Sequence, residues 1–227
     1  MKIMNMQKAR ADFFSDVYQK NLWGSAQSRS GEGSELGWTS DLVEKLPILL
    51  RTHGVRCLLD VPCGDFHWMQ AIDLEGVEYI GGDIVPQIVV ANQERHGSAS
   101  RRFIELDIVA DALPSADMIF VRDCFIHFDN ALVFEALHNI ARSSIRYLCM
   151  THDLNAARYP NGQNIELDRA KAGVNFEYRP IHFELPPYSF PPPAAAVKDG
   201  DHWAMSGGVK TMAVWDMAAV RATLSAR

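Results

Sequence analysis

The chain has 227 residues, of which 48% are hydrophobic and 22% are charged. This balance excludes a disordered, collagen-like or coiled-coil chain, and the length suits one α/β domain with additions. The formal net charge is −6, from 22 basic and 28 acidic residues, and no dense run of Lys or Arg is present to replace counterions on a phosphate backbone. We therefore expect no nucleic-acid partner.

The four cysteines, Cys57, Cys63, Cys124 and Cys149, form no C-x-x-C pair and no zinc-like spacing with histidine. Reduced thiols of this kind are typical of a cytoplasmic protein. The first residues lack the continuous apolar stretch of a signal peptide, and no apolar run is long enough to span a bilayer. We expect a cytoplasmic monomer or homodimer with no membrane partner.

Two helices are predicted before the first strand, over residues 8–19 and 40–51, and Pro47 is expected to interrupt or bend the second. The Gly/Ser-rich segment 23–34 lies between them. Its composition suits a flexible linker, but Trp23 and Trp38 bracket it, and aromatic residues are uncommon in linkers. An ordered lid over a binding site is the preferred interpretation.

Five short apolar runs follow, over 56–61, 78–83, 102–107, 116–123 and 145–151. Each is typical of a buried parallel strand. Helix-like stretches follow three of them, over 68–73, 86–96 and 130–142. The alternation indicates a doubly wound α/β fold, with helices on both faces of a mostly parallel sheet. Residues 209–215 are predicted to form a last strand, followed by a helix.

Acidic residues follow the predicted strands, at Asp83, Asp107, Asp123 and Asp153. Ligands of open α/β sheets bind at the carboxyl ends of the strands, so we expect these side chains to line one crevice. The first strand runs instead into a loop over residues 60–66, where glycine 64 permits a tight turn. A helix beginning at position 68 would direct its first N–H groups at the crevice.

The sequence of the loop after the first strand distinguishes between the possible classes of ligand. It has one glycine, whereas a dinucleotide fingerprint requires several, and no Walker loop is present. A nucleoside without phosphates fits better. Asp83 lies 19 residues after Gly64, and its carboxylate can accept hydrogen bonds from both ribose hydroxyls. The carboxylate of Asp107 can accept a hydrogen bond from the adenine amino group. Ile84 or Ile108 would flank the ring. With an amino-acid group held near residue 65, this combination describes S-adenosylmethionine.

The successive segments LLDVPCGDFHWM, YIGGDIV, RFIELDI and DMIFVRDCFIHF resemble motifs of class I S-adenosylmethionine-dependent methyltransferases, over residues 56–153. WGSAQSRSGEGSEL combined with the first of these resembles an uncharacterised bacterial subgroup with small-molecule substrates. The resemblance implies a seven-stranded, Rossmann-like sheet whose reversed last hairpin is supplied by residues 178–215. The family's loop has more glycines, and here Pro62 and Phe66 replace two of them.

The resemblance assigns residues 53–227 to the methyltransferase domain and residues 1–52 to N-terminal helices and a lid, all in one compact unit. It places these residues at S-adenosylmethionine: Trp23, Ser30, Asp60, Pro62, Cys63, Gly64, Asp65, Trp68, Asp83, Ile84, Asp107, Ile108, Arg122 and Asp123.

The family places residues after the fourth strand beside the methionine group and the acceptor. His127 can take a proton from an acceptor hydroxyl, or it packs against the following helix. Asp123 binds the cofactor's amino group or orients the acceptor. His152, at the end of the fifth strand, is a second candidate base. These groups and Asp153 could converge on a metal, but they are ordinary at neighbouring strand ends, so we expect no metal.

Three residues are predicted to bind the acceptor. Arg29 would meet an anionic acceptor or the cofactor's carboxylate, and Asn164 and Arg179 follow the fifth strand, where this fold shapes selectivity. Arg179 is equally suited to a surface ion pair. The predicted activity is O-methylation of a small molecule or saccharide with a side-chain general base. N- or C-methylation of a small molecule, and cofactor binding without catalysis, are the alternatives.

Overall fold

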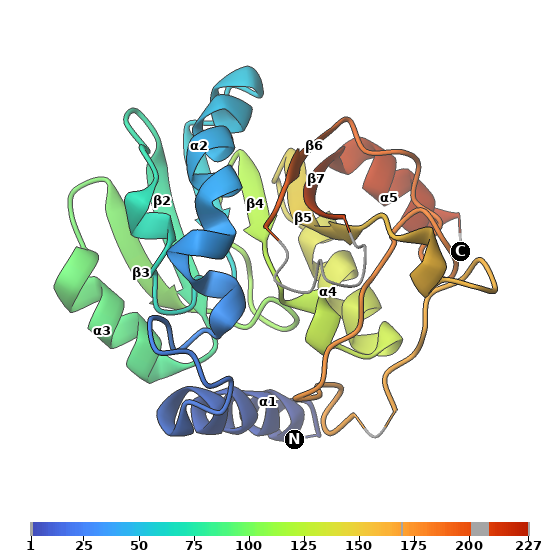
Figure 1. The fold of residues 1–227 in the computed structure, drawn as a ribbon, viewed down its shortest axis with the longest axis horizontal. Helices are drawn as coiled ribbons and strands as arrows, with labels where there is room; N and C mark the ends of the chain where they lie inside the picture. The colour runs from blue at the N-terminus through green and yellow to red at the C-terminus, as the bar shows by residue number, and fades with distance from the viewer. Residues whose placement is uncertain (1, 169, 201–208, 227) are drawn as a thin grey trace.

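The computed structural model describes residues 2–168, 170–200 and 209–226. At its centre is a seven-stranded sheet in the order β3-β2-β1-β4-β5-β7-β6 (Figure 1). The strands are β1 (Cys57–Asp60), β2 (Glu78–Asp83), β3 (Arg101–Glu105), β4 (Met118–Val121), β5 (Tyr147–Asp153), β6 (Ala195–Lys198) and β7 (Lys210–Asp216). The first five are parallel, and β7 is antiparallel to both β5 and β6. The predicted fold class, including the reversed last hairpin, is confirmed.

The α-helices are α1 (Lys2–Lys20), α2 (Leu36–Thr52), α3 (Pro86–His96), α4 (Asn130–Arg142) and α5 (Met217–Ser225). The predicted interruption at Pro47 is wrong, because α2 is assigned as one helix through this residue. Leu42, Leu46, Leu49 and Leu50 are buried on both sides of the proline. Their packing against the sheet offsets the lost backbone hydrogen bond.

The helix predicted over residues 68–73 is also wrong. Only a 3-10 turn, Met69–Ala71, follows β1, and Ile72 is already in an extended conformation. A segment this short gains too few backbone hydrogen bonds to offset helix nucleation. Its buried side chains, Trp68 and Met69, instead hold it against the core. The crevice therefore does not receive a helix N-terminus from this segment.

Side chains of the central strands alternate between two apolar cores. Leu59 packs in a core that includes Val133 of α4, whereas its neighbour Leu58 packs in another that includes Leu46 of α2 and Ile88 of α3. The alternation follows from the two-residue period of a strand. Because both faces are covered, the strands must be apolar throughout, which is why they appear in the sequence as continuous apolar runs.

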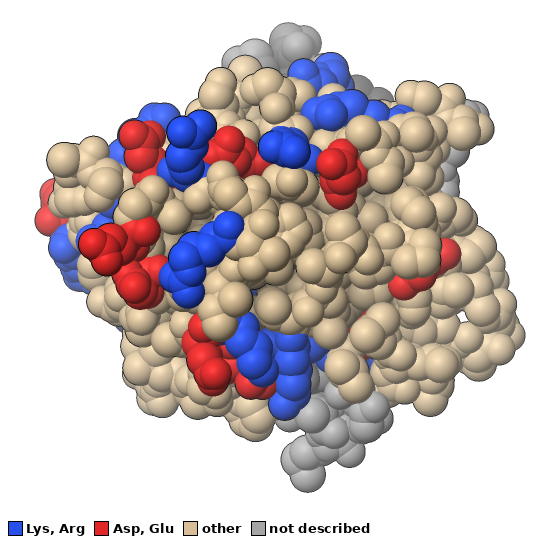
Figure 2. Space-filling model, turned by 90° about the horizontal axis from the view of Figure 1, so that it is seen from above, with Lys and Arg blue, Asp and Glu red and all other residues tan. Residues whose placement is uncertain are grey.

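Figure 1 shows α1 lying along the lower edge of the molecule, apart from the other helices, and α2 in front of the sheet. Within the part of the chain that the structure describes, no helix combines the length and the hydrophobicity needed to cross a bilayer. On the face seen in Figure 2, acidic and basic side chains are interspersed, and neither sign forms a continuous patch.

Candidate active site

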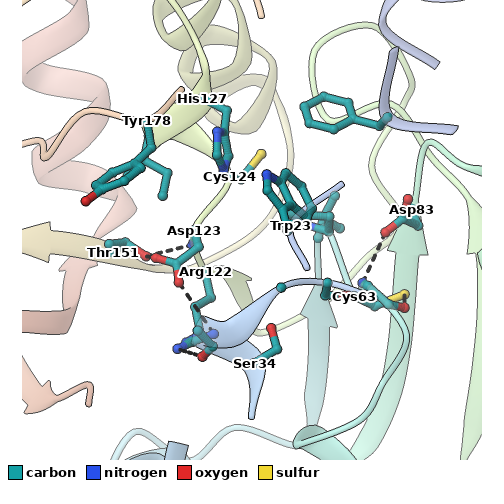
Figure 3. A pocket seen from close by; sticks show the side chains of 18 of the residues that line it. Trp23, Ser34, Cys63, Asp83, Arg122, Asp123, Cys124, His127, Thr151 and Tyr178 are labelled. Carbon is teal, nitrogen blue, oxygen red and sulfur yellow. Dashed lines mark hydrogen bonds and ion pairs between the residues drawn. The ribbon is translucent and has the colours of Figure 1, made fainter. Parts of the chain in front are cut away.

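A pocket of about 750 Å³ lies at the carboxyl ends of the central strands, a size ordinary for a ligand site. It is lined by all fourteen residues that the resemblance places at the cofactor, and by His127 and Arg29. Figure 3 shows Asp83 and Cys63 toward one end, Asp123, Thr151 and Tyr178 toward the other, and Trp23 between them. We call these the loop end and the acceptor end.

The loop after β1 is folded against Asp83. The backbone N–H of Gly64 donates to one carboxylate oxygen of Asp83 and the N–H of Val85 donates to the other, each over 3.0 Å. Gly64 has a φ of +54°, and a Cβ at this position would collide with the hydroxyl oxygen of Ser30. Glycine is therefore required here for both conformation and space.

Burial raises the pKa of two of the acidic residues at the loop end, Asp83 and Asp60. It raises the pKa of Asp83 to about 6, against the opposing effect of its backbone hydrogen bonds. It raises the pKa of Asp60 to about 7, although the hydroxyl of Tyr79 donates to this carboxylate over 2.6 Å. The loop end therefore gains negative charge as the pH rises through 6 and 7, which suits a cationic ligand.

Asp107 is already engaged by a residue of α1. Arg10 donates to one of its carboxylate oxygens over 2.6 Å, and the backbone N–H of Val109 donates to the other over 2.9 Å. Both charged side chains are buried, at 3% and 2% exposed. Any contact with an adenine amino group would thus be shared with a cation. No local sequence signal marks Arg10 as a partner of Asp107, because the two residues are 97 positions apart.

The Gly/Ser-rich segment is packed on the loop after β1. Asp65 accepts hydrogen bonds from the hydroxyls of Ser28 and Ser30 and, over 2.7 Å, from the backbone N–H of Arg29. The hydroxyl oxygen of Ser30 accepts in turn from the N–H of Asp65 over 3.0 Å. Residues 28–30 therefore lie against the loop end.

Two cationic and two acidic side chains form an ion-pair network at the acceptor end. Buried Arg122 donates to Asp199 over 2.8 and 3.0 Å, and also to the carbonyl of Gly33. Lys210 lies 2.6 Å from Asp123 and 3.1 Å from Asp199. Burial alone would raise the pKa of Asp123, but Lys210 and Arg122 hold it well below its usual value. Asp123 is therefore ionised and a poor proton acceptor.

His127 presents one nitrogen as a base. Its Nδ1 lies 3.3 Å from the backbone carbonyl oxygen of Glu177. A carbonyl only accepts, so Nδ1 carries the hydrogen in the neutral ring and Nε2 keeps its lone pair. Burial lowers the pKa of His127, which keeps the ring neutral at pH 7. The ring lines the pocket and stacks on Trp23, with centroids 5.3 Å apart.

The placement of His152 does not support its prediction as a second base. It is fully buried outside the pocket lining, edge-on to Trp215, while its neighbours Thr151 and Asp153 line the pocket. The reason is the alternation of side chains along β5. A position at the carboxyl end of a strand places a residue near the pocket, but the side chain of only every second residue along the strand faces it.

His152 belongs to a polar cluster with His182 and Glu184, whose potential ligand atoms lie within 4.8 Å of one another. The backbone N–H of Phe183 donates to Nδ1 of His152 over 3.2 Å. Neutral His152 therefore carries its hydrogen on Nε2, the nitrogen 3.5 Å from the Glu184 carboxylate. Among the described residues this Nε2 has no hydrogen-bond partner. A protonated nitrogen does not ligate, so the geometry does not favour a metal centre that includes His152.

Two of the three predicted acceptor-binding residues lie outside the pocket lining. Arg179 is 3% exposed and donates to the carbonyls of Phe128 and Ile165. Asn164 donates to three backbone carbonyls, including that of His182. Both residues hold the long segment between β5 and β6 in place, a role that a single sequence does not distinguish from ligand binding. The alternative of a surface ion pair for Arg179 is wrong, because this side chain is buried.

Arg29 does line the pocket, but its guanidinium is turned toward α1. Its Nη1 donates to the carbonyls of Tyr18 and Gln19, over 3.2 and 3.1 Å. The acceptor end instead receives Phe176 and Tyr178, which the sequence did not single out for binding. Aromatic residues in an irregular segment are usually packing residues, and no local pattern marked these as pocket residues.

No protein-family model matches the chain, and no curated protein matches it significantly. Among solved structures, the methyltransferase domain of bacterial CtHen1 matches with a TM-score of 0.55 and 10% identity, over 78% of this chain and 98% of that one. Human N-acetylserotonin methyltransferase, in complex with SAM, matches with a TM-score of 0.49 and 13% identity, over 77% and 55%. Magnesium protoporphyrin IX methyltransferase from Synechocystis matches with a TM-score of 0.47 and 15% identity, over 65% and 72%.

The match to the bacterial domain extends over nearly all of that domain, and at 10% identity it concerns architecture. The chain spans about half the length of the human enzyme. Strand order, the reversed last hairpin and the pocket at the carboxyl ends of the strands agree with the sequence motifs. The chain has the Rossmann-like fold of a class I methyltransferase domain.

Proposed function

We propose that this protein is an S-adenosylmethionine-dependent methyltransferase that methylates an oxygen atom of a small molecule, with His127 as the general base. One observation carries the proposal. A single pocket joins a glycine turn held by Asp83 to a neutral imidazole whose Nδ1 faces a backbone carbonyl, which places the basic lone pair on Nε2. The first feature suits a nucleoside, and the second suits proton removal from an acceptor.

The residues of the loop end fit this cofactor. The carboxylate of Asp83 accepts hydrogen bonds from backbone N–H groups and keeps capacity for a ribose hydroxyl. Asp60 and Asp83 supply negative charge that favours a sulfonium over a pyrophosphate. Ile84 and Ile108 line the pocket and offer apolar surface to a purine ring. Asp107 contributes together with Arg10 rather than alone.

When bound, S-adenosylmethionine supplies an activated methyl group on a positively charged sulfur. His127 accepts the acceptor's proton at Nε2 as the new carbon–oxygen bond forms and the carbon–sulfur bond breaks, leaving the electron pair on sulfur. Ionised Asp123 favours the resulting imidazolium electrostatically, and the face of Trp23 adds a cation–π contact. The lid excludes water and holds the reactants in line.

Cofactor binding is tested first by calorimetry with S-adenosylhomocysteine. We expect wild-type protein to bind and Asp83→Ala to bind at least about tenfold more weakly, since hydrogen bonds to a charged group are lost. Glu94→Ala, on the exposed face of α3, is the matched control and should retain wild-type affinity. An unchanged affinity in Asp83→Ala would refute the ribose assignment. A wild-type protein that does not bind would refute the proposal itself.

Catalysis is tested by the release of S-adenosylhomocysteine in the presence of an acceptor. His127→Asn should lower turnover about 10²- to 10⁴-fold, the usual contribution of a general base. Its affinity for S-adenosylhomocysteine should change less than about threefold, because His127 is assigned to the acceptor end. Equal turnover in the two proteins would point to N- or C-methylation without this base.

Surface charge and the cysteines support the partners and the location that we propose. The mixed charges on the face in Figure 2 support a small-molecule acceptor over a nucleic acid. The four cysteines are free thiols, and three of them are buried. This supports a cytoplasmic location.

A further inference from the structure

Aromatic rings form one side of the acceptor end. Trp23 stacks on His127 with an interplanar angle of 26°, and on Phe176 with centroids 6.5 Å apart and an angle of 24°. Tyr178 lines the same end (Figure 3). Phe176 and Tyr178 are 44% and 38% exposed. The aromatic surface therefore runs from the exposed rim of the pocket to the candidate base.

Two segments outside the sheet converge to build this surface. Trp23 belongs to the N-terminal lid, and residues 176–178 belong to the long segment between β5 and β6. The backbone of the second segment is fixed to the turn that carries His127, because Asn175 donates to the carbonyl of His127 and Arg179 donates to that of Ile126. The backbone that carries Phe176 and Tyr178 is thus fixed to the backbone that carries the candidate base, and Trp23 contacts both segments through its ring.

Resting on the proposed function, we propose that the acceptor is a flat aromatic compound with a phenolic hydroxyl, bound against Trp23 and Phe176 with its oxygen at Nε2 of His127. Rings in nearly parallel planes favour a flat partner, because offset stacking adds to the burial of apolar area. A saccharide stacked on the same rings through its C–H face would need a hydrogen-bond partner for each buried hydroxyl around its edge, because burial without one is costly.

The charges at this end also favour an uncharged acceptor. Lys210 is paired with Asp123 and Asp199, and Arg122 with Asp199. Arg158, on the rim, lies 2.7 Å from Asp153. Each of these three cations thus already faces a carboxylate, so a phosphate or carboxylate on the acceptor would have to compete with it.

The acidity of a phenol suits the base. Burial keeps His127 neutral and makes it a weaker base than an exposed histidine. A phenolic hydroxyl such as that of tyrosine has a pKa of about 10, whereas water has a pKa of about 15.7 and represents an unactivated hydroxyl. Removing the proton of a phenol is therefore easier by about five to six orders of magnitude. The proton goes to Nε2, the methyl carbon bonds to the phenolic oxygen, and the departing sulfur becomes a thioether.

The test compares a flat alcohol with its saturated counterpart on the protein saturated with S-adenosylhomocysteine. We expect 2-naphthol to bind about tenfold more tightly than decahydro-2-naphthol by calorimetry. Trp23→Leu should reduce this ratio to below about threefold, and Phe176→Leu, at the exposed rim, should reduce it partly. Trp38→Leu is the matched control, because Trp38 lies on α2 outside the pocket lining, and it should leave the ratio unchanged.

Activity then tests the hydroxyl. With S-adenosylmethionine, wild-type protein should form the methyl ether of 2-naphthol, detected by mass spectrometry, and His127→Asn should not. Equal binding of the saturated alcohol, no binding of either, or an unchanged ratio in Trp23→Leu would overturn the aromatic acceptor. Faster methylation of 2-naphthylamine would overturn the hydroxyl. Failure to bind S-adenosylhomocysteine at all would refute the proposed function instead, so the two failures are distinguishable.

Discussion

Replacing Arg10 with methionine should destabilise the protein far more than its place on an N-terminal helix suggests. Arg10 and Asp107 are 2.6 Å apart, with 3% and 2% of their side chains exposed. Methionine keeps much of the apolar volume but leaves the Asp107 carboxylate buried with one remaining donor, the N–H of Val109. Removing one partner of a buried ion pair costs about 3–5 kcal/mol.

For a chain of this size, 1 kcal/mol corresponds to about 2–4 °C in melting temperature, so Arg10→Met should melt about 6–20 °C below wild type. Differential scanning calorimetry gives the shift, and urea unfolding gives the change in free energy. Lys8→Met is the matched control on the same helix. Lys8 pairs with Asp12, but both side chains are mostly exposed, at 73% and 65%. The control should stay within about 0.5 kcal/mol of wild type.

The double variant Arg10→Met/Asp107→Asn separates the lost ion pair from the stranded charge. An asparagine oxygen still accepts from Val109, and the uncompensated charge is removed. The double variant should therefore recover a large part of the loss, and the two single changes should not be additive. A shift below about 2 °C for Arg10→Met, or strict additivity, would show that the pair does not hold α1 against the sheet.

Three further outcomes are expected. Leu59→Ala should cost about 2–5 kcal/mol in urea unfolding, whereas Ile48→Ala, 53% exposed, should cost less than about 0.5; similar values would contradict the assignment of the core. Gly64→Ala should weaken S-adenosylhomocysteine binding by about tenfold with an unchanged circular-dichroism spectrum, because its Cβ would push Ser30 away. The pKa of Asp83, about 6, means that its charge is lost below that pH and present above it. The affinity for the cationic cofactor relative to its neutral product should thus rise between pH 5.5 and 7.5 by calorimetry, and a constant ratio would contradict this.

Much of the fold could be predicted from the sequence because its signals are local. A strand buried on both faces must be apolar throughout, so β1, β2, β4 and β5 could be recognised without a structure. Gly64, and Asp83 at the end of β2, could be recognised as parts of the loop end because they too are local signals. These features depend only on neighbouring residues and on the rule that ligands bind at the carboxyl ends of parallel strands.

Which side chains reach the pocket depends on tertiary packing. Thr151 and Asp153 face it while His152 enters the core, because the orientation of β5 depends on what packs against each face. Arg10 meets Asp107 from 97 positions away, and Trp23 meets Phe176 from a different segment. Such contacts form only when distant segments dock, and the free energy of that docking is a property of the whole packed molecule. Local sequence signals therefore predicted the sheet, the turn and a class of ligand, whereas the packing of distant segments set the walls of the site.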